Sequence, residues 1–154
     1  MIKNPNAHRI AILLAVAGLV PFVAMLGLLL MDNKHFYFSG LVSYGAIILS
    51  FLGAINWGIA LAGKTDSPSN QQLYLWGVIP PLVAWSALIF QQSIGLKILI
   101  ASYIIHLLVD RWMSIKLKLP TWYLNLRLGL SLSVTSILIA ALYYYQFSKD
   151  YDLG

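Results

Sequence analysis

Polar side chains recur at every fourth position in two stretches of the sequence that are otherwise apolar. The first stretch carries Ser102, His106 and Asp110, and the second carries Arg127 and Ser131. Residues four apart lie on one face of an α-helix, so the polar side chains of each set lie on one face of their helix. Serine, histidine and aspartate are the residue types of a hydrolase triad, and ionisable groups within a membrane can form ion pairs or proton pathways.

We do not expect a hydrolase or a metalloprotein. A triad needs its serine beside an oxyanion hole, and the amides of a regular helix are already bonded to the helix's own carbonyls. His8, His35 and His106 fall on different levels or sides of the predicted membrane, which argues against a shared metal ion. The sequence contains no Cys, so thiolate metal sites and cysteine nucleophiles are excluded. The sequence therefore predicts no catalytic residues, no metal site and no cofactor.

The composition indicates that these polar side chains belong to a membrane protein. The 154 residues are 60% hydrophobic and 10% charged, with a mean hydropathy of +0.78. Soluble domains are about 25% charged, and one of this length could not bury so much apolar surface. The net charge of +5 is unevenly distributed, which indicates membrane orientation rather than nucleic-acid binding. We expect a single membrane domain, residues 1–154, surrounded by the lipid bilayer.

Five apolar runs are long enough to cross a bilayer as helices. The predicted spans are residues 10–31, 40–62, 73–90, 94–109 and 124–147. Pro21, Pro80 and Pro81 lie inside the first and third spans. Proline removes a backbone donor, so we expect helix kinks at these positions and a break at the Pro80-Pro81 pair. Residues 110–123 are basic and aromatic and are predicted to lie at the lipid interface. The predicted fold class is an all-α integral membrane bundle of five transmembrane helices.

Lysine and arginine residues are unequally divided between the two ends of this bundle. Seven belong to the amino-terminal side and three to the other side. The larger group is Lys3, Arg9, Lys64, Arg111, Lys116, Lys118 and Arg127, and the smaller group is Lys34, Lys97 and Lys149. Positive residues are enriched on the cytoplasmic side of membrane proteins. The sequence therefore predicts the amino terminus inside and the carboxyl terminus outside.

The span 40–62 carries a stripe of small residues and is predicted to be the packing centre of the bundle. Ala46, Ala54 and Gly58 lie on this stripe, which allows neighbouring backbones to approach closely. Asn56, in the same span, needs hydrogen-bond partners that lipid cannot supply. We predict that it joins a polar cluster in the cytoplasmic half of the bundle. The predicted cluster is Asn56, His106, Asp110, Arg127 and Ser131.

A purely structural interpretation of this cluster stays open. Asp110 and Arg127 are expected at the same depth, where they could form an ion pair or extend separately to the interface. His106 could be a hydrogen-bonded packing residue, and small hydroxyl residues such as Ser131 suit helix contacts in membranes.

Four further residues are candidates for lining a cavity. Trp57 and Trp85 lie further inside their spans than an interfacial belt of aromatic residues would place them. Tyr44 and Ser50, both in the span 40–62, are the other two candidates.

Four fragments of the sequence, taken together, resemble one protein family. They are residues 18–22 (GLVPF), 44–58 (YGAIILSFLGAINWG), 80–85 (PPLVAW) and 120–127 (PTWYLNLR). The family is the one known as domain of unknown function 3429. The resemblance implies a small multi-pass protein of bacterial inner membranes and mitochondria, and it implies no established activity. The family often carries His where this chain has Asn56, which implies hydrogen bonding rather than proton transfer at that position.

These features predict a small multi-pass protein of the bacterial inner membrane without catalytic activity. We expect an accessory or assembly factor, or a membrane-embedded binding module. The alternative is a small ligand or lipid carrier, or a proton or solute pathway, that uses the polar cluster. The expected partners are the lipid bilayer and either other inner-membrane subunits or a small hydrophobic ligand, and nucleic acid is not expected.

Overall fold

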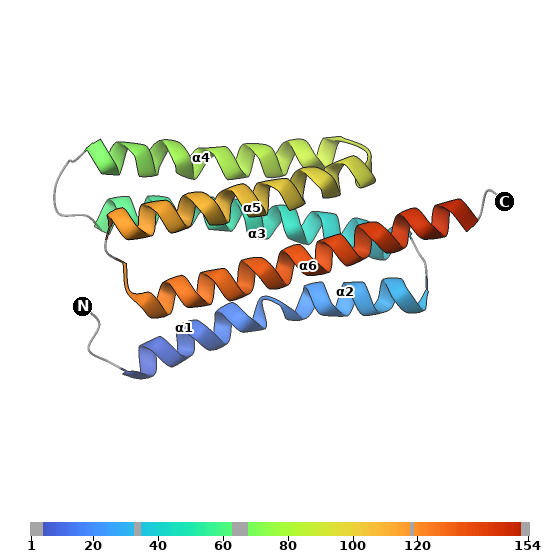
Figure 1. Ribbon diagram of the computed structural model, residues 1–154, viewed down its shortest axis with the longest axis horizontal. Helices are drawn as coiled ribbons and strands as arrows, with labels where there is room; N and C mark the ends of the chain where they lie inside the picture. The colour runs from blue at the N-terminus through green and yellow to red at the C-terminus, as the bar shows by residue number, and fades with distance from the viewer. Residues whose placement is uncertain (1–4, 33–34, 63–67, 118, 152–154) are drawn as a thin grey trace.

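Nearly every described residue is helical, because each backbone N–H and C=O in lipid must find a partner within its own segment. The computed structural model describes residues 5–32, 35–62, 68–117 and 119–151. Of these residues 94% are in helices and none is in a strand (Figure 1). The helices are α1 (Pro5–Ala17), α2 (Val20–Met31), α3 (His35–Ala62), α4 (Pro68–Ile89), α5 (Gln92–Lys116) and α6 (Thr121–Tyr151). The predicted all-α class is confirmed for this part of the chain.

Within the described residues, five helical segments are long and apolar enough to cross a membrane. The first segment, Arg9–Met31, combines α1 with α2, and each of the helices α3 to α6 provides one more. Only 11% of the most apolar window of the first segment is buried within the bundle, compared with 44% for α3. The span predicted to be the packing centre is therefore the most enclosed one, and the first span lies at the periphery.

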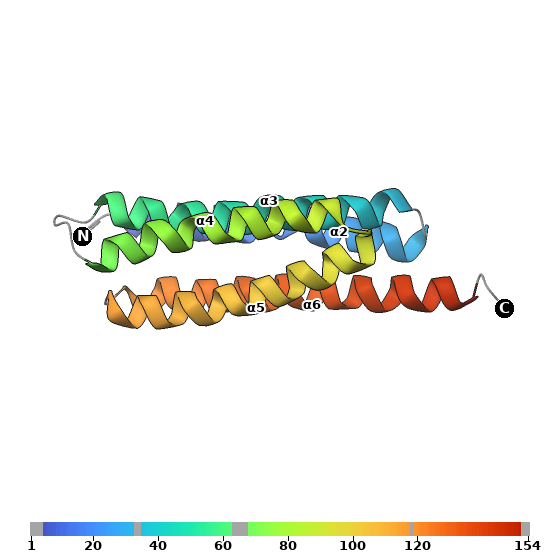
Figure 2. The ribbon, with the colours of Figure 1, turned by 90° about the horizontal axis from the view of Figure 1, so that it is seen from above.

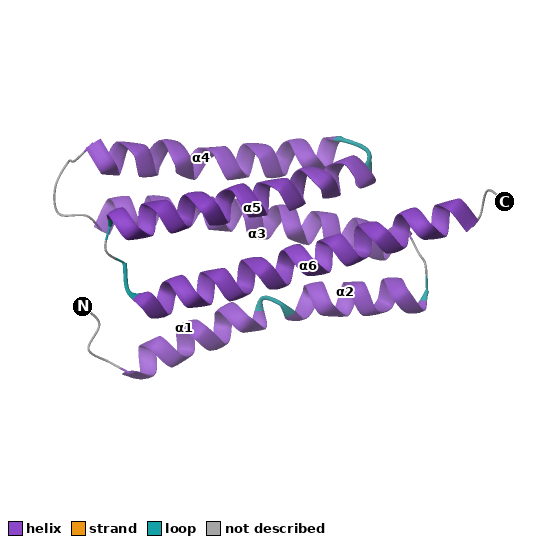
Figure 3. Cartoon of the chain, in the orientation of Figure 1, coloured by secondary structure: helices purple, strands orange, loops and turns teal. Residues whose placement is uncertain are grey.

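The first span is two helices rather than one kinked helix. The chain leaves the helix at Gly18 and Leu19, and Figure 3 shows this break between α1 and α2. Pro21 lies in the first turn of α2, where its missing N–H costs nothing, and the break precedes it. The Tyr44 hydroxyl on α3 donates a hydrogen bond of 3.0 Å to the Gly18 carbonyl at the break. The predicted kink at Pro21 is therefore replaced by a break upstream of it.

The predicted break at Pro80-Pro81 is wrong, because α4 continues through both residues. Proline at these positions deprives the carbonyls of Trp76 and Gly77 of their helical N–H partners. Membrane helices tolerate such a loss when a neighbouring helix packs against the exposed backbone. Here α3 provides that neighbour at Gly53.

Close packing of α3 on α4 depends on Gly53 and Gly77. A Cβ atom on Gly53 would lie 2.6 Å from the Gly77 carbonyl oxygen and 2.8 Å from Cδ of Pro81, which is too close. A Cβ atom on Gly77 would meet the Gly53 carbonyl at 3.0 Å and would clash with the Trp57 ring. Two glycines therefore allow the two backbones to meet directly, as small residues do at tight membrane helix contacts.

The predicted small-residue stripe is not the packing face of α3 within the bundle. Ala46 is buried, but Ala54 and Gly58 are exposed on the outer surface. A Cβ atom on Gly58 would meet nothing within 4 Å. The buried face runs through other residues of the helix. These include Leu41, Gly45, Leu49, Leu52, Gly53, Asn56 and Ala60.

Helices α5 and α6 extend beyond their predicted ends. We predicted that the span of α5 ends at residue 109 and that residues 110–123 lie along the interface, but α5 continues to Lys116. Its apolar face continues too, since Met113 is buried against Ala60 and Leu73. The carbonyl of Pro120 accepts hydrogen bonds from the next helix and so begins α6 at Thr121. Asp110 is consequently well inside a helix.

Figure 2 shows two layers, one with α5 and α6 and the other with α3 and α4. Helix α5 runs obliquely, from the layer of α6 toward the layer of α3 and α4. The main core lies where these layers meet, and its largest fully buried side chains come from α2, α3, α5 and α6. They include Phe22, Phe38, Leu49, Leu99, Tyr103 and Leu138. Because lipid tails are as apolar as these side chains, close packing and interhelical hydrogen bonds hold the bundle together.

Candidate functional site

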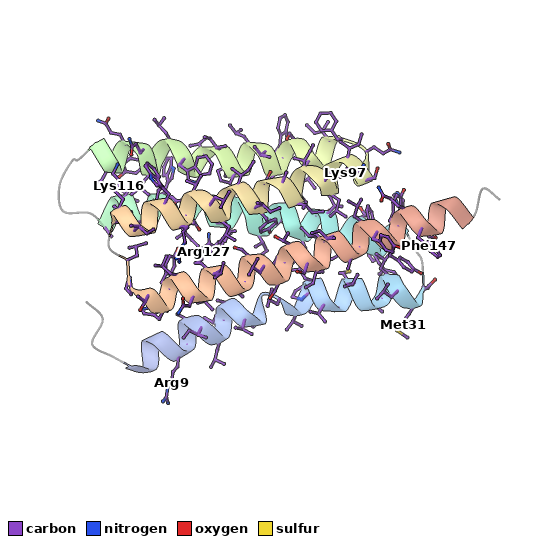
Figure 4. The ribbon with its side chains drawn as sticks, in the orientation of Figure 1. Arg9, Met31, Lys97, Lys116, Arg127 and Phe147 are labelled. Atoms are coloured by element: carbon purple, nitrogen blue, oxygen red, sulfur yellow. The ribbon has the colours of Figure 1, made fainter. Side chains whose placement is uncertain are left out.

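The α5–α6 hairpin holds a buried ion pair. The Nε atom of Arg127 donates a hydrogen bond of 2.9 Å to Oδ2 of Asp110, and a terminal guanidinium nitrogen contacts the same oxygen. The connection between Lys116 and Thr121 is short, so the two helices are antiparallel neighbours that bring these residues to one depth. Figure 4 shows Arg127 between α5 and α6, toward the end of the bundle that carries Arg9 and Lys116. The expected pairing of opposite charges is thus present.

His106 lies one turn from Asp110 on the same face of α5 and is only 2% exposed. Its Nε2 atom is 3.5 Å from Oδ1 of Asp110, the second carboxylate oxygen. Its ring is stacked with that of Trp76 from α4, with centroids 6.0 Å apart and an interplanar angle of 10°. Neither ring nitrogen has a hydrogen-bond partner among the described residues. We call His106, Asp110 and Arg127 the polar row.

The other two members of the predicted cluster are buried but lie outside this row. Ser131 is 4% exposed and follows Arg127 by one turn of α6. Asn56 is 3% exposed on the inner face of α3. Its side-chain nitrogen has no hydrogen-bond partner in the described part of the chain. The hydrogen bonds and ion pairs seen there connect His106, Asp110 and Arg127 to one another but do not include Asn56.

Ser102 is not oriented as an activated nucleophile. The Ser102 hydroxyl donates a hydrogen bond of 2.7 Å to the carbonyl of Ile98 in its own helix, rather than to His106. A nucleophilic serine would need the opposite orientation, with its proton accepted by the imidazole. Among the described residues, no three His, Asp or Glu side chains lie close enough together to hold a metal ion.

An apolar cavity between α1, α3 and α6 reaches Arg127, and we call it the α1–α3–α6 cavity. Its volume is about 310 Å³. Aliphatic and aromatic side chains form most of its walls. These include Leu14, Phe22, Ile48, Phe51, Leu130 and Val134. Its polar lining residues are Tyr103, Trp122, Tyr123, Arg127 and Ser131. The break at Gly18 and Leu19 also borders the cavity, so α1 and α2 line it on both sides of their junction.

A smaller cavity lies on the opposite side of the polar row, and we call it the α3–α4–α5 cavity. Its volume is about 110 Å³. Its lining residues are Leu49, Trp76, Ile79, Pro80, Val83, Ser102, Ile105 and His106. The polar row therefore runs from His106 in this cavity to Arg127 in the larger one.

The four predicted cavity-lining residues have other roles in the bundle. The Trp57 indole nitrogen donates a hydrogen bond of 3.0 Å to the Tyr74 carbonyl, which ties α3 to α4. Its ring borders an open groove of about 300 Å³ on the outer surface, not an internal cavity. Trp85 is 64% exposed and faces outward.

The hydroxyl groups of Tyr44 and Ser50 donate hydrogen bonds to backbone carbonyls. Tyr44 donates its hydroxyl to Gly18 at the break in the first span. The Ser50 hydroxyl donates a hydrogen bond of 2.9 Å to the Ala46 carbonyl, one turn earlier in α3. Of the four candidates for lining a cavity, Trp57 lines the surface groove, whereas Tyr44, Ser50 and Trp85 line none of the three hollows described here.

Sequence reasoning missed Tyr103 and Trp76. The Tyr103 side chain is 1% exposed, and its hydroxyl donates a hydrogen bond of 2.9 Å to the Gly45 carbonyl of α3. A tyrosine in the middle of an apolar helix is a signal for such a bond, because a buried hydroxyl in lipid needs a partner. The indole nitrogen of Trp76 is buried without a partner among the described groups, and its ring is stacked with that of His106.

The chain is similar to a family of unknown function and to proteins named for their place in a membrane. The sequence profile of the family described as "Protein of unknown function (DUF3429)" matches residues 7–143. "Transmembrane protein 69" of Xenopus tropicalis is 29% identical over 141 residues, which cover 89% of this chain and 55% of that protein. "Transmembrane protein 69" of Mus musculus is 24% identical over 125 residues, or 80% of this chain and 51% of that protein. The chain thus spans about half the length of these curated relatives. No solved structure matches it.

Proposed function

Because the chain belongs to the family described as "Protein of unknown function (DUF3429)", a description that names no activity, we propose from the geometry of the structure that the protein is a non-enzymatic, membrane-embedded binding module. Its ligand is a small apolar molecule that dissolves in the bilayer. The observation that carries this proposal is the α1–α3–α6 cavity, which is apolar along most of its walls and ends at Arg127.

The size and lining of the cavity support this function. Ligand sites in proteins have volumes of about 300–1,000 Å³, with apolar walls and a few polar groups that fix the ligand's orientation. The α1–α3–α6 cavity has about 310 Å³ and gathers its polar groups on α5 and α6. An apolar body along α1 and α3 and a polar end near Arg127 and Ser131 would match this division.

The charge balance at Arg127 favours a neutral ligand. Arginine has five N–H donors, and Asp110 uses only part of them. The Asp110 carboxylate already compensates the guanidinium charge, and the cavity contains no other charged side chain among its lining residues. An anionic ligand would add a buried charge without a partner, which is strongly unfavourable. We therefore propose a neutral molecule with a hydrogen-bond acceptor, such as an ester or ketone oxygen, near one end.

Photolabelling in nanodiscs of defined neutral lipid tests this proposal. The probe is the methyl ester of a long-chain fatty acid that carries a diazirine, and the matched probe is the free acid. We expect the ester to label residues of the cavity and the free acid to label them less. Preferential labelling by the free acid would contradict a neutral ligand.

Two tryptophan substitutions locate the labelling. Leu130→Trp fills the cavity and should reduce labelling by the ester, because Leu130 lines it. Leu132→Trp is the control, since Leu132 is 53% exposed on the outer face of the same helix. Equal labelling of the two variants would place the probe outside the cavity and would overturn the proposal.

An accessory or assembly role is the competing function, and purification in mild detergent distinguishes the two. A retained small apolar molecule with the protein alone supports the binding module. Stoichiometric partner subunits without such a molecule would favour the accessory role and would count against our proposal.

For the membrane itself, we propose the bacterial cytoplasmic membrane with the amino terminus inside. The division of Lys and Arg supports this orientation, because Arg9 and Lys116 lie at one end of the bundle and Lys97 at the other (Figure 4). The curated relatives reported above are animal proteins. The orientation is therefore proposed from the charges of this chain rather than from those proteins.

A further inference from the structure

We propose that α1 is a lid over the α1–α3–α6 cavity, which pivots at the break between α1 and α2 and closes toward α3 when a ligand occupies the cavity. This inference rests on the proposed function for its ligand, and it adds how access to that site is controlled. The structure described above is the open position of the lid, in which the bilayer reaches the cavity.

The first argument is that the two halves of the first span are held differently. Helix α2 carries the fully buried residues Phe22 and Leu29 and packs against α3 and α6. None of the described side chains of α1, residues 9–17, is buried, and the main contact of α1 is with α6. Figure 1 shows α1 diverging from α3 toward its amino-terminal end. Segments with few buried contacts are the ones that move most readily, so α2 is the anchor and α1 the mobile arm.

The second argument is that the break between the two halves has the construction of a hinge. Pro21 has no N–H, so the Ala17 carbonyl loses its helical partner and the helix is interrupted between them. The Tyr44 hydroxyl of α3 holds the Gly18 carbonyl over 3.0 Å. The Tyr44 ring also packs edge-on against Phe22 of α2, with centroids 4.8 Å apart. The pivot is therefore fixed to the core, and the rotation falls on the few residues that precede it.

The third argument is that the walls of the cavity are not yet packed together. Leu14 of α1 and Phe51 of α3 both line the cavity, yet they are 69% and 62% exposed. Ala11 and Ala15 lie one turn apart on the same wall of α1, and small residues allow a helix to approach its neighbour closely. A ligand between α1 and α3 would supply the close packing that α1 lacks, and such packing is what drives helix association in lipid.

Spin-label distances in nanodiscs test the lid. The sequence contains no Cys, so Ile10→Cys and Leu61→Cys carry the only labels, on α1 and α3. Both positions are exposed, and neither lines the cavity. Ile10 is about 12 Å along the helix from the break, which amplifies a small rotation. Val23→Cys on α2, paired with the same label at residue 61, is the control, since Val23 is also exposed.

Without ligand we expect a broad distribution of α1–α3 distances and a narrow one for α2–α3. An α1–α3 distribution as narrow as the control would overturn the proposal. The fatty-acid methyl ester used for photolabelling should then narrow the α1–α3 distribution and shift it to shorter distances. If the ester labels the cavity but the distances do not move, the lid is wrong and the proposed function stands. If the ester labels no residue of the cavity, the proposed function fails and closure on that ligand fails with it.

A substitution at the hinge provides the second test. Pro21→Ala restores an N–H that can bond to the Ala17 carbonyl and should join α1 and α2 into one helix. We expect a narrower α1–α3 distribution without ligand and a loss of the shift caused by the ester. Gly27→Ala is the control within α2, because a Cβ atom there meets nothing within 4 Å. The α2–α3 distance reports whether each variant is folded. A distribution as broad in a folded Pro21→Ala variant as in the unchanged protein would overturn the hinge.

Discussion

Two nitrogens of the Arg127 guanidinium contact the same carboxylate oxygen of Asp110. This oxygen accepts a hydrogen bond of 2.9 Å from Nε and also contacts a terminal nitrogen. Both residues are less than a tenth exposed, so each charge depends on the other. The second carboxylate oxygen is turned toward His106. The pair therefore compensates a charge on each of two helices, and the His106 ring lies beside it.

Removing one member of this pair should destabilise the protein more than removing both. Asp110→Asn or Arg127→Gln leaves a buried charge without a partner, which costs about 3–5 kcal/mol when the site is fully buried. The double variant should recover part of that loss. The measurement is a double-mutant cycle of unfolding free energy in detergent. A coupling free energy near zero would show that the two charges are separately solvated.

Lys116→Gln is the control for this cycle. The Lys116 ammonium donates a hydrogen bond of 3.1 Å to Gln72 at an exposed position. Its loss should change stability by less than about 1 kcal/mol, the usual value for exposed polar pairs.

Gly53→Ala should disturb the bundle, whereas Gly58→Ala should not. The added methyl group at residue 53 would meet the Gly77 backbone at 2.6 Å, and backbone cannot move aside as a flexible side chain can. Overpacking of this kind costs about 1–3 kcal/mol. At Gly58 the methyl group meets nothing and replaces a poor helix former. Thermal unfolding in detergent compares the two variants, and equal melting temperatures would contradict the observed α3–α4 contact.

Tyr44→Phe should loosen the junction between α1 and α2. The hydroxyl of Tyr44 satisfies the Gly18 carbonyl at the break, and its loss removes one interhelical hydrogen bond worth about 1 kcal/mol. Hydrogen exchange of backbone amides around residues 18–23 should become faster, while that in the middle of α3 stays unchanged. Tyr143→Phe, at a 72% exposed position, serves as the control and should leave both regions as they are.

Reporter fusions at residues 3 and 154 should lie on opposite sides of the membrane, with the amino-terminal reporter in the cytoplasm. The described residues contain five candidate spans, an odd number that would separate the two ends, and the excess of Lys and Arg at the amino-terminal side predicts the direction. Two reporters on the same side would contradict the five-span topology.

The ion pair could be predicted from the sequence because it depends only on helix spacing and on a short connection. Asp110 and Arg127 have opposite signs and fall at the same depth of antiparallel neighbours, so no knowledge of the remaining helices is needed. The five spans were predictable for a similar reason, since length and polarity along the chain determine them. The ends of α5 and α6 were not, because charged residues such as Arg111 and Lys116 continue a helix as readily as they end one.

The packing face of α3 could not be read from the sequence. In a soluble helix the polar side faces water, but the outward residues of α3 are as apolar as the inward ones, as Ile47 and Leu49 show. Small residues occur on both faces, so Gly58 and Gly53 were equally plausible contacts. Only the position of Gly77 on α4 decides between them. The lining of each cavity depends on such relative positions of several helices, which is why the four candidate residues did not identify it.

The buried charges also affect how α5 and α6 enter the membrane during synthesis. A single Asp or Arg at the centre of an isolated helix opposes insertion by about 2.5–3.5 kcal/mol. Asp110 and Arg127 lie nearer the end of their helices, but each would still face lipid alone if its helix inserted first. Their hydrogen bond can form only when both helices are present. We therefore expect that α5 leaves the translocon only together with α6, so that these two helices enter the bilayer as a hairpin.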